Sequence, residues 1–416
     1  MVPGRAASGH FRVLPQEGTD WRDVVSQTSR QEDGRWPGLR RRSPLRSSDN
    51  SGSRPFPVRA EHYPSNVPRQ VAVRVSQDGE DSVSAAPDMV SAPSPGGERF
   101  RPPATLSVVI CAYTLERWAD IVAGVESLRR QTRPPEQVVL VSDHNAELLE
   151  RAQAAFPQMI CVPNAGERGL SGARNTGVAV ATGDVVAFLD DDAAAEPDWA
   201  ERMLEAYRAD DVLGVGGAVS PAWRAPRPRW FPDEFLWVVG CSYAGLPTSP
   251  AEIRNPIGAN MSFRREVFAT AGGFDVGMGR LGKDAAGCEE TEFSIRARRV
   301  YRAGRIVLEP TAGCRHNVTP DRVTRTYFRR RCRAEGRSKA LVSQLAGADM
   351  ALRSERTYVL RTLPHAMLAG LAAMARGDVF GGARAWAILE GTALTATSYV
   401  LMRARLRWRS RRSAAD

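Results

Sequence analysis

The sequence contains a run of three aspartates directly after an apolar segment. Asp190, Asp191 and Asp192 follow residues 185–189, which are typical of a strand covered on both faces. Three like charges at the end of a buried strand are electrostatically costly unless a cation neutralises them. Carboxylate oxygens, together with substrate phosphates, are the ligands that Mg²⁺ and Mn²⁺ prefer. The triplet therefore predicts a divalent cation that holds a diphosphate and offsets its charge as it departs.

Further acidic residues stand where chemistry can use them. Asp143 follows the apolar segment 137–141, so we expect it at the same sheet edge, where it can accept hydrogen bonds from a base or ribose. Glu289 and Glu290 open a predicted helix, where acids complement the helix dipole. The dipole also lowers a carboxylate's pKa and weakens it as a base, whereas burial or neighbouring acids raise that pKa. The sequence leaves this balance open.

The elements that must position these residues alternate between strands and helices. Strands are predicted at 106–111, 137–141 and 185–189, and helices at 118–128, 197–207 and 289–302. A Gly/Ser-rich stretch at 166–177 is expected to lead into a further short helix that ends at Gly183. This order predicts an α/β fold with a parallel sheet, whose ligand lies beyond the carboxyl ends of the strands. Residues 214–255, rich in Pro, Trp and Gly, are predicted to form a sheet edge and loops that shape an acceptor site.

Four segments occur in a specific order along the chain. They are Leu106–Tyr113, Gly172–Gly177 followed by Thr182–Asp184, Phe188–Asp192, and Glu289–Phe293. Together they resemble glycosyltransferase family 2 of the non-processive bacterial type, over about residues 106–337. The resemblance implies a GT-A fold, an α/β fold with a mostly parallel central sheet, followed here by a helical C-terminal region.

The resemblance also implies a role for each matched residue. Asp190 and Asp192 are the ends of the DxD motif, with Asp192 the stronger candidate for metal contact. Glu290 stands at the catalytic base, which in the family is usually Asp, so its extra methylene changes the geometry of the base. The implied sites are catalytic for Glu290 and Glu289; donor-nucleotide-binding for Ala112, Tyr113, Thr114, Asp143, Arg174, Asp190 and Asp191; metal-binding for Asp192, Asp190 and His316; and acceptor-binding for Asn260 and Met261.

The implied reaction is a single displacement that inverts the anomeric carbon. A sugar moves from a nucleoside-diphosphate sugar to an acceptor hydroxyl, with Glu290 taking the hydroxyl proton and Mg²⁺ or Mn²⁺ stabilising the leaving diphosphate. UDP is the expected nucleotide, with GDP and dTDP as alternatives. The expected acceptors are a cell-envelope glycan, a lipid-linked molecule or a natural product.

Other classes of protein fit the sequence less well. A sugar nucleotidyltransferase would share the α/β core but needs a Gly-rich basic loop where residues 112–116 stand, and a Rossmann dehydrogenase needs GxGxxG there. The net charge of +10 fits a basic nucleic-acid-binding protein, yet the arginines cluster in tails without an interleaved aromatic pattern. We therefore expect no nucleic-acid partner. A processive synthase needs a QxxRW motif, which residues 329–333 do not match.

The chain of 416 residues is expected to comprise three parts. Residues 1–104, rich in Arg, Ser, Pro and Gly, are predicted to form a disordered extension. Residues 105–337 would be the GT-A domain, and 338–416 a helical region with a basic tail. The N-terminus shows no signal-peptide pattern, which predicts a cytoplasmic location. Residues 385–402 carry one charge, Glu390, and are expected to pack as a helix or lie on the inner leaflet of the membrane rather than span it.

Overall fold

The computed structural model describes residues 100–278, 287–346 and 356–413. The chain divides into two units, Met1–Pro87 and Asp88–Asp416, and all described residues belong to the second. The predicted disordered extension lies outside the described residues as far as position 99. Phe100 is buried, and its ring lies 5.5 Å from that of Tyr301. The folded part therefore begins before the predicted boundary at residue 105.

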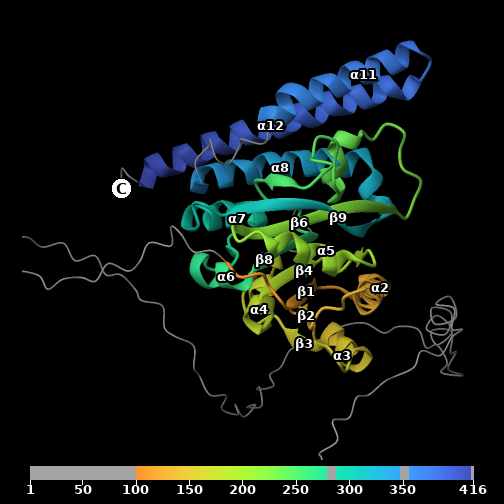
Figure 1. Ribbon diagram of the computed structural model, residues 1–416. Helices are drawn as coiled ribbons and strands as arrows, with labels where there is room; N and C mark the ends of the chain where they lie inside the picture. Colours follow the sequence, from red (N-terminus) through yellow and green to blue (C-terminus); the bar gives the residue numbers. More distant parts are fainter. Residues whose placement is uncertain (1–99, 279–286, 347–355, 414–416) are drawn as a thin grey trace, which may run out of the picture. The chain divides into compact units, whose positions relative to one another are not determined.

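Nine strands in the described part of the chain form one sheet, in the order β3-β2-β1-β4-β8-β6-β9-β5, with β7 paired to β9 (Figure 1). Strands β3, β2, β1 and β4 are parallel, as are β6 and β9. The other pairings are antiparallel. The α/β prediction is confirmed, with its parallel part concentrated in the first four strands. The strands are β1 (Leu106–Ala112), β2 (Gln137–Ser142), β3 (Ile160–Pro163), β4 (Val185–Leu189), β5 (Ala193–Ala195), β6 (Val212–Trp223), β7 (Ala251–Ile253), β8 (Asn260–Arg264) and β9 (Arg305–Val318).

Helices cover both faces of the sheet because successive side chains of a strand point to opposite faces. Val108 and Ile110 of β1 belong to a core shared with α2, α3 and α5, whereas Val109 belongs to a second core shared with α4, α6 and α7. This double burial explains why the strands are continuous apolar runs. The helices are α2 (Trp118–Arg129), α3 (Ala146–Ala155), α4 (Leu170–Val180), α5 (Trp199–Glu205), α6 (Arg265–Ala271) and α7 (Glu289–Val300).

The segment 214–255 was predicted to form a sheet edge; its β7 pairs with one strand alone, but its β6 does not lie at an edge. β6 lies between β8 and β9, in the interior of the sheet. Its glycines are signals of loops in a sequence, but here they permit close packing. A Cβ on Gly217 would lie 1.9 Å from the carbonyl oxygen of Ala312. The loops that were expected follow β6 and contain the short helix η3 (Asp233–Val239).

The C-terminal helices pack onto this core. α8 (Arg325–Ala346) runs through the predicted domain boundary at 337, and α12 (Val379–Ser413) packs along α8 while forming a hairpin with α11 (Leu363–Ala375) (Figure 1). None of the helices in the described ranges has the length and hydropathy needed to cross a bilayer. The remaining short helices are η1 (Leu115–Arg117), η2 (Ala206–Arg208), η4 (Pro320–Val323) and η5 (Tyr358–Thr362).

Gly336 sets the separation of α8 and α12, because a Cβ there would lie 2.2 Å from the carbonyl oxygen of Thr395. We expect Gly336→Ala to push the helices apart and lower the free energy of unfolding by about 1–3 kcal/mol. Thermal unfolding measures this as a lower Tm. Gly313→Ala is the control, since its nearest neighbouring atom would be Glu196 Cγ at 3.4 Å. Equal Tm values for the two variants would contradict the close packing of α12 on α8.

Candidate active site

Asp143 lies at the carboxyl edge of the sheet, as predicted. Its backbone N–H donates to the carbonyl oxygen of Ala112 at 2.7 Å. Its carboxylate accepts from Asn164 Nδ2 at 2.7 Å and from the backbone N–H of Gly169 at 3.0 Å. The buried carboxylate therefore fixes the loop that leads into α4. Its contact with a nucleotide stays a prediction.

The residues after β1 form the neighbouring surface. The side chain of Ala112 is buried, whereas Tyr113 is 43% exposed and its ring centroid lies 5.5 Å from the Arg117 guanidinium. Thr114 Oγ1 accepts from the backbone N–H of Glu116 and so caps η1. An exposed ring beside a cation has the chemistry of the predicted wall behind a nucleotide base.

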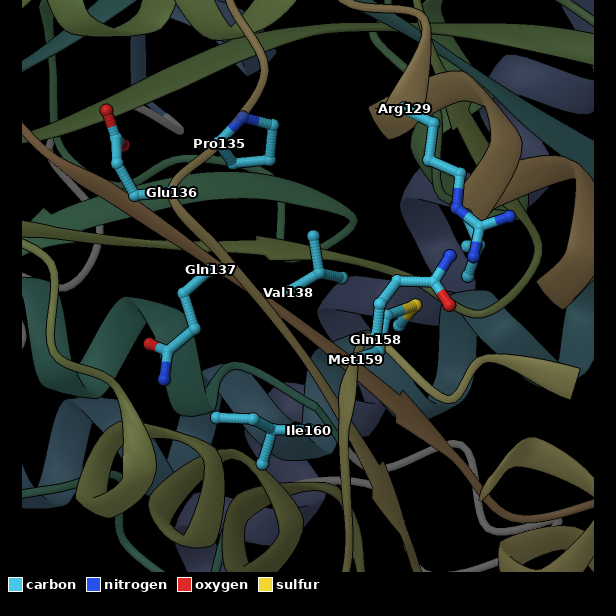
Figure 2. A pocket seen from close by; sticks show the side chains of 9 residues that line it. Arg129, Pro135, Glu136, Gln137, Val138, Gln158, Met159 and Ile160 are labelled. Atoms are coloured by element: carbon cyan, nitrogen blue, oxygen red, sulfur yellow. The ribbon is translucent and has the colours of Figure 1, made fainter. Parts of the chain in front are cut away.

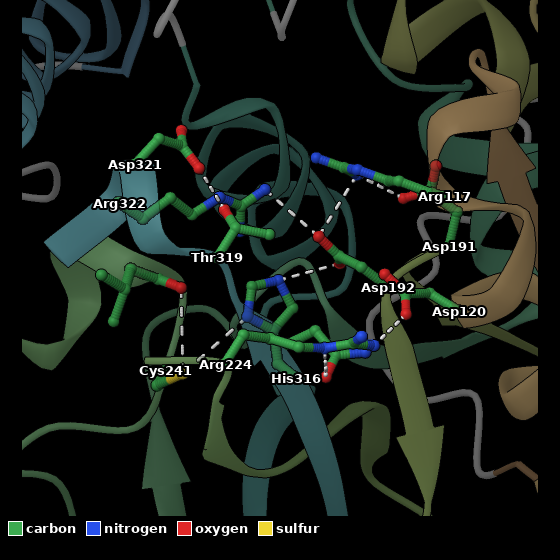
Figure 3. Close-up of polar contacts among 12 residues, drawn as sticks. Arg117, Asp120, Asp191, Asp192, Arg224, Cys241, His316, Thr319, Asp321 and Arg322 are labelled. Atoms are coloured by element: carbon green, nitrogen blue, oxygen red, sulfur yellow. Dashed lines mark hydrogen bonds and ion pairs between the residues drawn. The ribbon is translucent and has the colours of Figure 1, made fainter. Parts of the chain in front are cut away.

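The three aspartates after β4 have three different environments. The side chain of Asp190 is 24% exposed, whereas Asp191 and Asp192 are buried. Asp191 Oδ1 pairs with Arg117 Nη1 at 2.5 Å. The carboxylate of Asp192 faces three cationic or ionisable groups in Figure 3: Arg117 at 3.2 Å, Arg322 at 3.2 Å and His316 at 3.0 Å. The protein itself supplies the counter-charge that the sequence assigned to a metal.

This arrangement separates the protonation equilibria of the triplet. Burial raises the pKa of Asp191 to about 7, against the attraction of Arg117. Burial also opposes the charge of Asp192, but His316 and the two arginines hold its pKa well below its usual range. The converse holds at His316, where burial disfavours the imidazolium but Asp192 raises the pKa to about 10. Asp192 is therefore the fixed anion of the group.

The predicted metal ligands do lie together. One ligand atom each from Asp190, Asp192 and His316 falls within 4.8 Å of the others. Asp192 Oδ1 is buried and accepts no hydrogen bond of acceptable geometry, although His316 Nε2 is 3.0 Å away. The two carboxylates suit Mn²⁺ or Mg²⁺, whereas the imidazole of His316, whose proton Asp192 stabilises, becomes a ligand only when the cation displaces that proton. The residues present therefore fit a divalent cation. Asp191, turned toward Arg117, stands outside this ligand set.

Arg174 connects the triplet to the start of α7. Its Nη1 donates to Glu289 Oε1 at 2.6 Å, and its Nη2 lies 3.6 Å from Asp190 Oδ1 and donates to the carbonyl oxygen of Gly258 at 3.0 Å. The guanidinium is buried, with the ring centroids of Phe188 and Phe274 at 5.7 and 5.6 Å. Acidic residues that are distant in sequence are thus held on opposite sides of one cation.

Glu289 and Glu290 differ in accessibility. Glu289 is buried against Arg174, and its Oε2 has no hydrogen-bond partner. Glu290 is partly exposed, and its Oε1 accepts from Thr291 Oγ1 at 3.2 Å. Burial, followed by the charge of Glu289, raises the pKa of Glu290 to about 7. The balance left open by the sequence therefore favours a carboxylate that can accept a proton near neutral pH.

The predicted acceptor residues occupy the core instead of a surface. Asn260 is fully buried, and its Nδ2 donates to the carbonyl oxygens of Ala218 and Ala312 while its Oδ1 accepts from Trp199 Nε1. Met261 is fully buried in the second core. Their side chains cannot contact an acceptor in this structure. The Asn260 amide instead ties β8 to β6, β9 and α5.

Three neighbours of the site were missed from the sequence: Arg117, Arg322 and Cys241. Cys241 Sγ lies 3.9 Å from His316 Nδ1, on the side of the ring opposite Asp192 (Figure 3). The one available signal was the electrostatic cost of burying three consecutive aspartates. This cost indicates that cationic groups lie nearby, but it does not identify them. Sequence spacing does not identify the arginines, because they lie 74 residues before Asp191 and 130 residues after Asp192.

A pocket of about 300 Å³ lies elsewhere on the described chain (Figure 2). It is lined by the end of α2 and the beginnings of β2 and β3, including Arg129, Gln137 and Ile160. This is the amino edge of the parallel strands, opposite the edge that carries Asp143 and Asp190. Ligands of open α/β sheets bind at the carboxyl edge. The pocket therefore does not belong to the acidic site.

Parts of this chain are similar to known proteins. Residues 107–272 match the family described as Glycosyl transferase family 2. The glucosyl-dolichyl phosphate glucuronosyltransferase of Haloferax volcanii is 42% identical over 195 residues, which are 46% of this chain and 62% of that protein. The succinoglycan biosynthesis protein ExoM of Rhizobium meliloti is 26% identical over 233 residues, 54% of this chain and 71% of that one. A mannosyltransferase from Pyrobaculum calidifontis, solved with GDP-Man and Mn²⁺, aligns with 74% of this chain and 91% of its own at 16% identity and a TM-score of 0.44.

Residues 107–272 therefore carry a glycosyltransferase family 2 domain. The predicted family is thereby confirmed for this segment, and the chain spans less than two thirds of the length of the Haloferax relative. A sugar nucleotidyltransferase and a basic nucleic-acid-binding protein, the alternatives raised by the sequence, are not members of this family. Within this glycosyltransferase domain, the roles of individual residues rest on the geometry above.

The Arg174–Glu289 pair gives a direct test of the site's architecture. We expect Arg174→Met to lower the free energy of unfolding by about 3–5 kcal/mol, because it leaves a buried carboxylate without its cation. Denaturant titration measures the change. Arg202→Met, which breaks exposed ion pairs with Asp198 and Glu205, is the control and should cost less than about 1 kcal/mol. Adding Glu289→Gln should recover part of the loss. Equal stability of the two single variants would refute the bridge.

Proposed function

We propose that this protein is an inverting glycosyltransferase that moves a sugar from a nucleoside-diphosphate sugar to an acceptor hydroxyl. The observation that carries the proposal is the bridge through Arg174, which holds Glu289 at 2.6 Å and Asp190 at 3.6 Å. It joins the start of α7, where the proton acceptor Glu290 follows Glu289, to the acidic end of β4. A base for the acceptor and a binding edge for the diphosphate are the two parts that direct displacement requires.

In this proposal Glu290 is the catalytic base. Its carboxylate takes the proton of the acceptor hydroxyl while that oxygen bonds to the anomeric carbon and the bond from this carbon to the diphosphate oxygen breaks. Partial exposure and a pKa near 7 suit Glu290 to this step. Glu289 is buried and paired, so it acts as a positioning residue through Arg174. The added methylene of Glu290, relative to the family's usual Asp, lengthens the reach of the base.

Asp190, Asp192 and His316 would hold a divalent cation, which when bound supplies positive charge at the departing diphosphate. Arg117 and Arg322 fix the orientation of Asp192 whether or not the cation is present. Tyr113, Thr114 and Asp143 would line the nucleotide. UDP is the expected nucleotide, with GDP and dTDP as alternatives.

A lipid-linked acceptor is the favoured class of substrate. The support is the Haloferax relative, which is named for transfer to a glucosyl-dolichyl phosphate. Its name also makes a uronic acid a reasonable first donor sugar to assay. A lipid-linked acceptor requires access to a membrane surface, so the proposed location is the cytoplasmic face of the inner membrane, with the C-terminal region in contact with lipid.

The pH dependence of transfer tests the base. Because Glu290 must be deprotonated to act, its raised pKa predicts that kcat/KM increases with pH and levels off above about pH 7. We expect Glu290→Gln to lower kcat by about 10²–10⁴-fold. Glu289→Gln should lower the pKa of Glu290, because it removes a neighbouring negative charge. The rise of kcat/KM should then occur at lower pH. An unchanged rate in Glu290→Gln would refute this assignment.

Binding of Mn²⁺ and donor tests the metal site without requiring turnover. We expect Mn²⁺ with one of the UDP-, GDP- or dTDP-sugars to raise the Tm of the full chain by mass action. Asp190→Asn should weaken the metal-dependent part of this shift, and electron paramagnetic resonance should show less bound Mn²⁺. Asp198→Asn, at an exposed aspartate outside the site, is the control. Full Mn²⁺ binding by Asp190→Asn would contradict the ligand set.

A further inference from the structure

The hairpin of α11 and α12 presents an uncharged face to solvent. α11 contains no Asp, Glu, Lys or Arg, and Leu368, Leu371 and Met374 are 66%, 45% and 47% exposed. In α12 every side chain classed as exposed between positions 379 and 404 is uncharged, including Trp386 at 58% and Val400 at 62%. Soluble proteins rarely leave an apolar surface of this continuity uncovered.

The exposed apolar residues of α12 share one side of the helix. At 3.6 residues per turn, Val379, Trp386, Leu389, Val400 and Leu401 fall within an arc of about 120°. The two charged side chains in this part of α12 are paired within the protein. Arg384 pairs with Asp378, and Glu390 pairs with Arg325 and Arg329 of α8. The side of α12 that meets the protein is apolar as well, since Ala387 and Ile388 are buried in the core. The exposed apolar side chains are therefore an addition to those that hold α12 on the protein.

The hairpin is held together by close backbone packing. A Cβ on Gly370 of α11 would lie 2.8 Å from the carbonyl oxygen of Gly381 in α12, and one on Gly381 would lie 2.3 Å from that of Gly370. Contact through small residues leaves the larger apolar side chains of both helices free to face outward. The exposed leucines are thus not needed to join the two helices.

Positive charge borders the uncharged face. Arg361 and Arg376 are exposed at the two ends of α11. Beyond position 404, α12 exposes Arg405 and Arg407, and Arg412 lies 4.1 Å from the ring centroid of Trp408. An apolar face rimmed by arginines and exposed tryptophans complements an anionic bilayer surface, where acyl chains meet negative headgroups. A second copy of this chain would bring like charges together.

We propose that the outer face of the α11–α12 hairpin inserts shallowly into an anionic bilayer, with Leu368, Leu371 and Trp386 among its anchors. This gives the membrane contact in the proposed function a defined surface, and it adds α11 to the segment indicated by the sequence. The hairpin also packs against η3, close to the active site. A Cβ on Gly391 of α12 would lie 2.4 Å from Phe235 Cε1 in η3, and Cys241, just after η3, lies 3.9 Å from His316 Nδ1.

Flotation of the full-length protein with lipid vesicles tests this surface. We expect the wild-type chain to float with vesicles of phosphatidylcholine containing phosphatidylglycerol, and less with phosphatidylcholine alone. Leu368→Glu/Leu371→Glu should lower the partition coefficient by about tenfold or more, because charge replaces inserted leucine. Ile160→Glu is the matched control: Ile160 is 39% exposed on β3, away from the hairpin, and this variant should bind as the wild type does.

The result is independent of catalysis, because Glu290→Gln should float as the wild type does. Loss of transfer with normal flotation would count against the base and leave the surface supported. Equal flotation of the double Glu variant and the control would overturn the docking surface. So would a stable dimer that the double variant abolishes, with no vesicle binding by the wild type, since it would assign the same face to a second copy.

Discussion

The arrangement of this site depends on the neutralisation of buried negative charge. Asp191 and Asp192 are almost fully buried, and the free-energy cost of burying an unpaired carboxylate is too large for a fold to bear. Their counter-charges come from three distant segments: Arg117 after β1, His316 on β9 and Arg322 in η4. The two halves of the sheet are thus joined electrostatically where the active site must form. In the same way, the buried Arg174 lies between Asp190 and Glu289 and offsets the negative charge of both.

The regular part of the fold could be predicted because local pattern and tertiary burial agree. β1, β2 and β4 are continuous apolar runs since helices cover both of their faces, and polar residues mark the point at which each strand leaves the core. The same pattern placed Asp143 and the aspartate triplet at one sheet edge. The spatial relation of Glu290 to this edge came from family resemblance, because no local signal connects α7 to β4.

The predictions that were wrong, for β6 and for Asn260, have specific causes. The glycines of β6 suggested loops, but each permits a close approach that only the three-dimensional partner reveals, such as the Ala312 carbonyl oxygen beside Gly217. The family resemblance assigned Asn260 to the acceptor, whereas its side-chain amide makes three hydrogen bonds in the core. The sequence could show that cations were required near the triplet. It could not show which arginines supply them.

The continuity of α8 has a consequence for changes to the C-terminal region. Its first turns follow η4, which carries Arg322, and its later part includes Ser338, whose Oγ accepts from the backbone N–H of Gly287 just before Glu289. The same helix is the platform for α12. A single continuous helix therefore contacts both the segment before Glu289 and the hairpin. Replacement of the C-terminal region without α8 would also remove the Ser338 contact that supports the segment before Glu289.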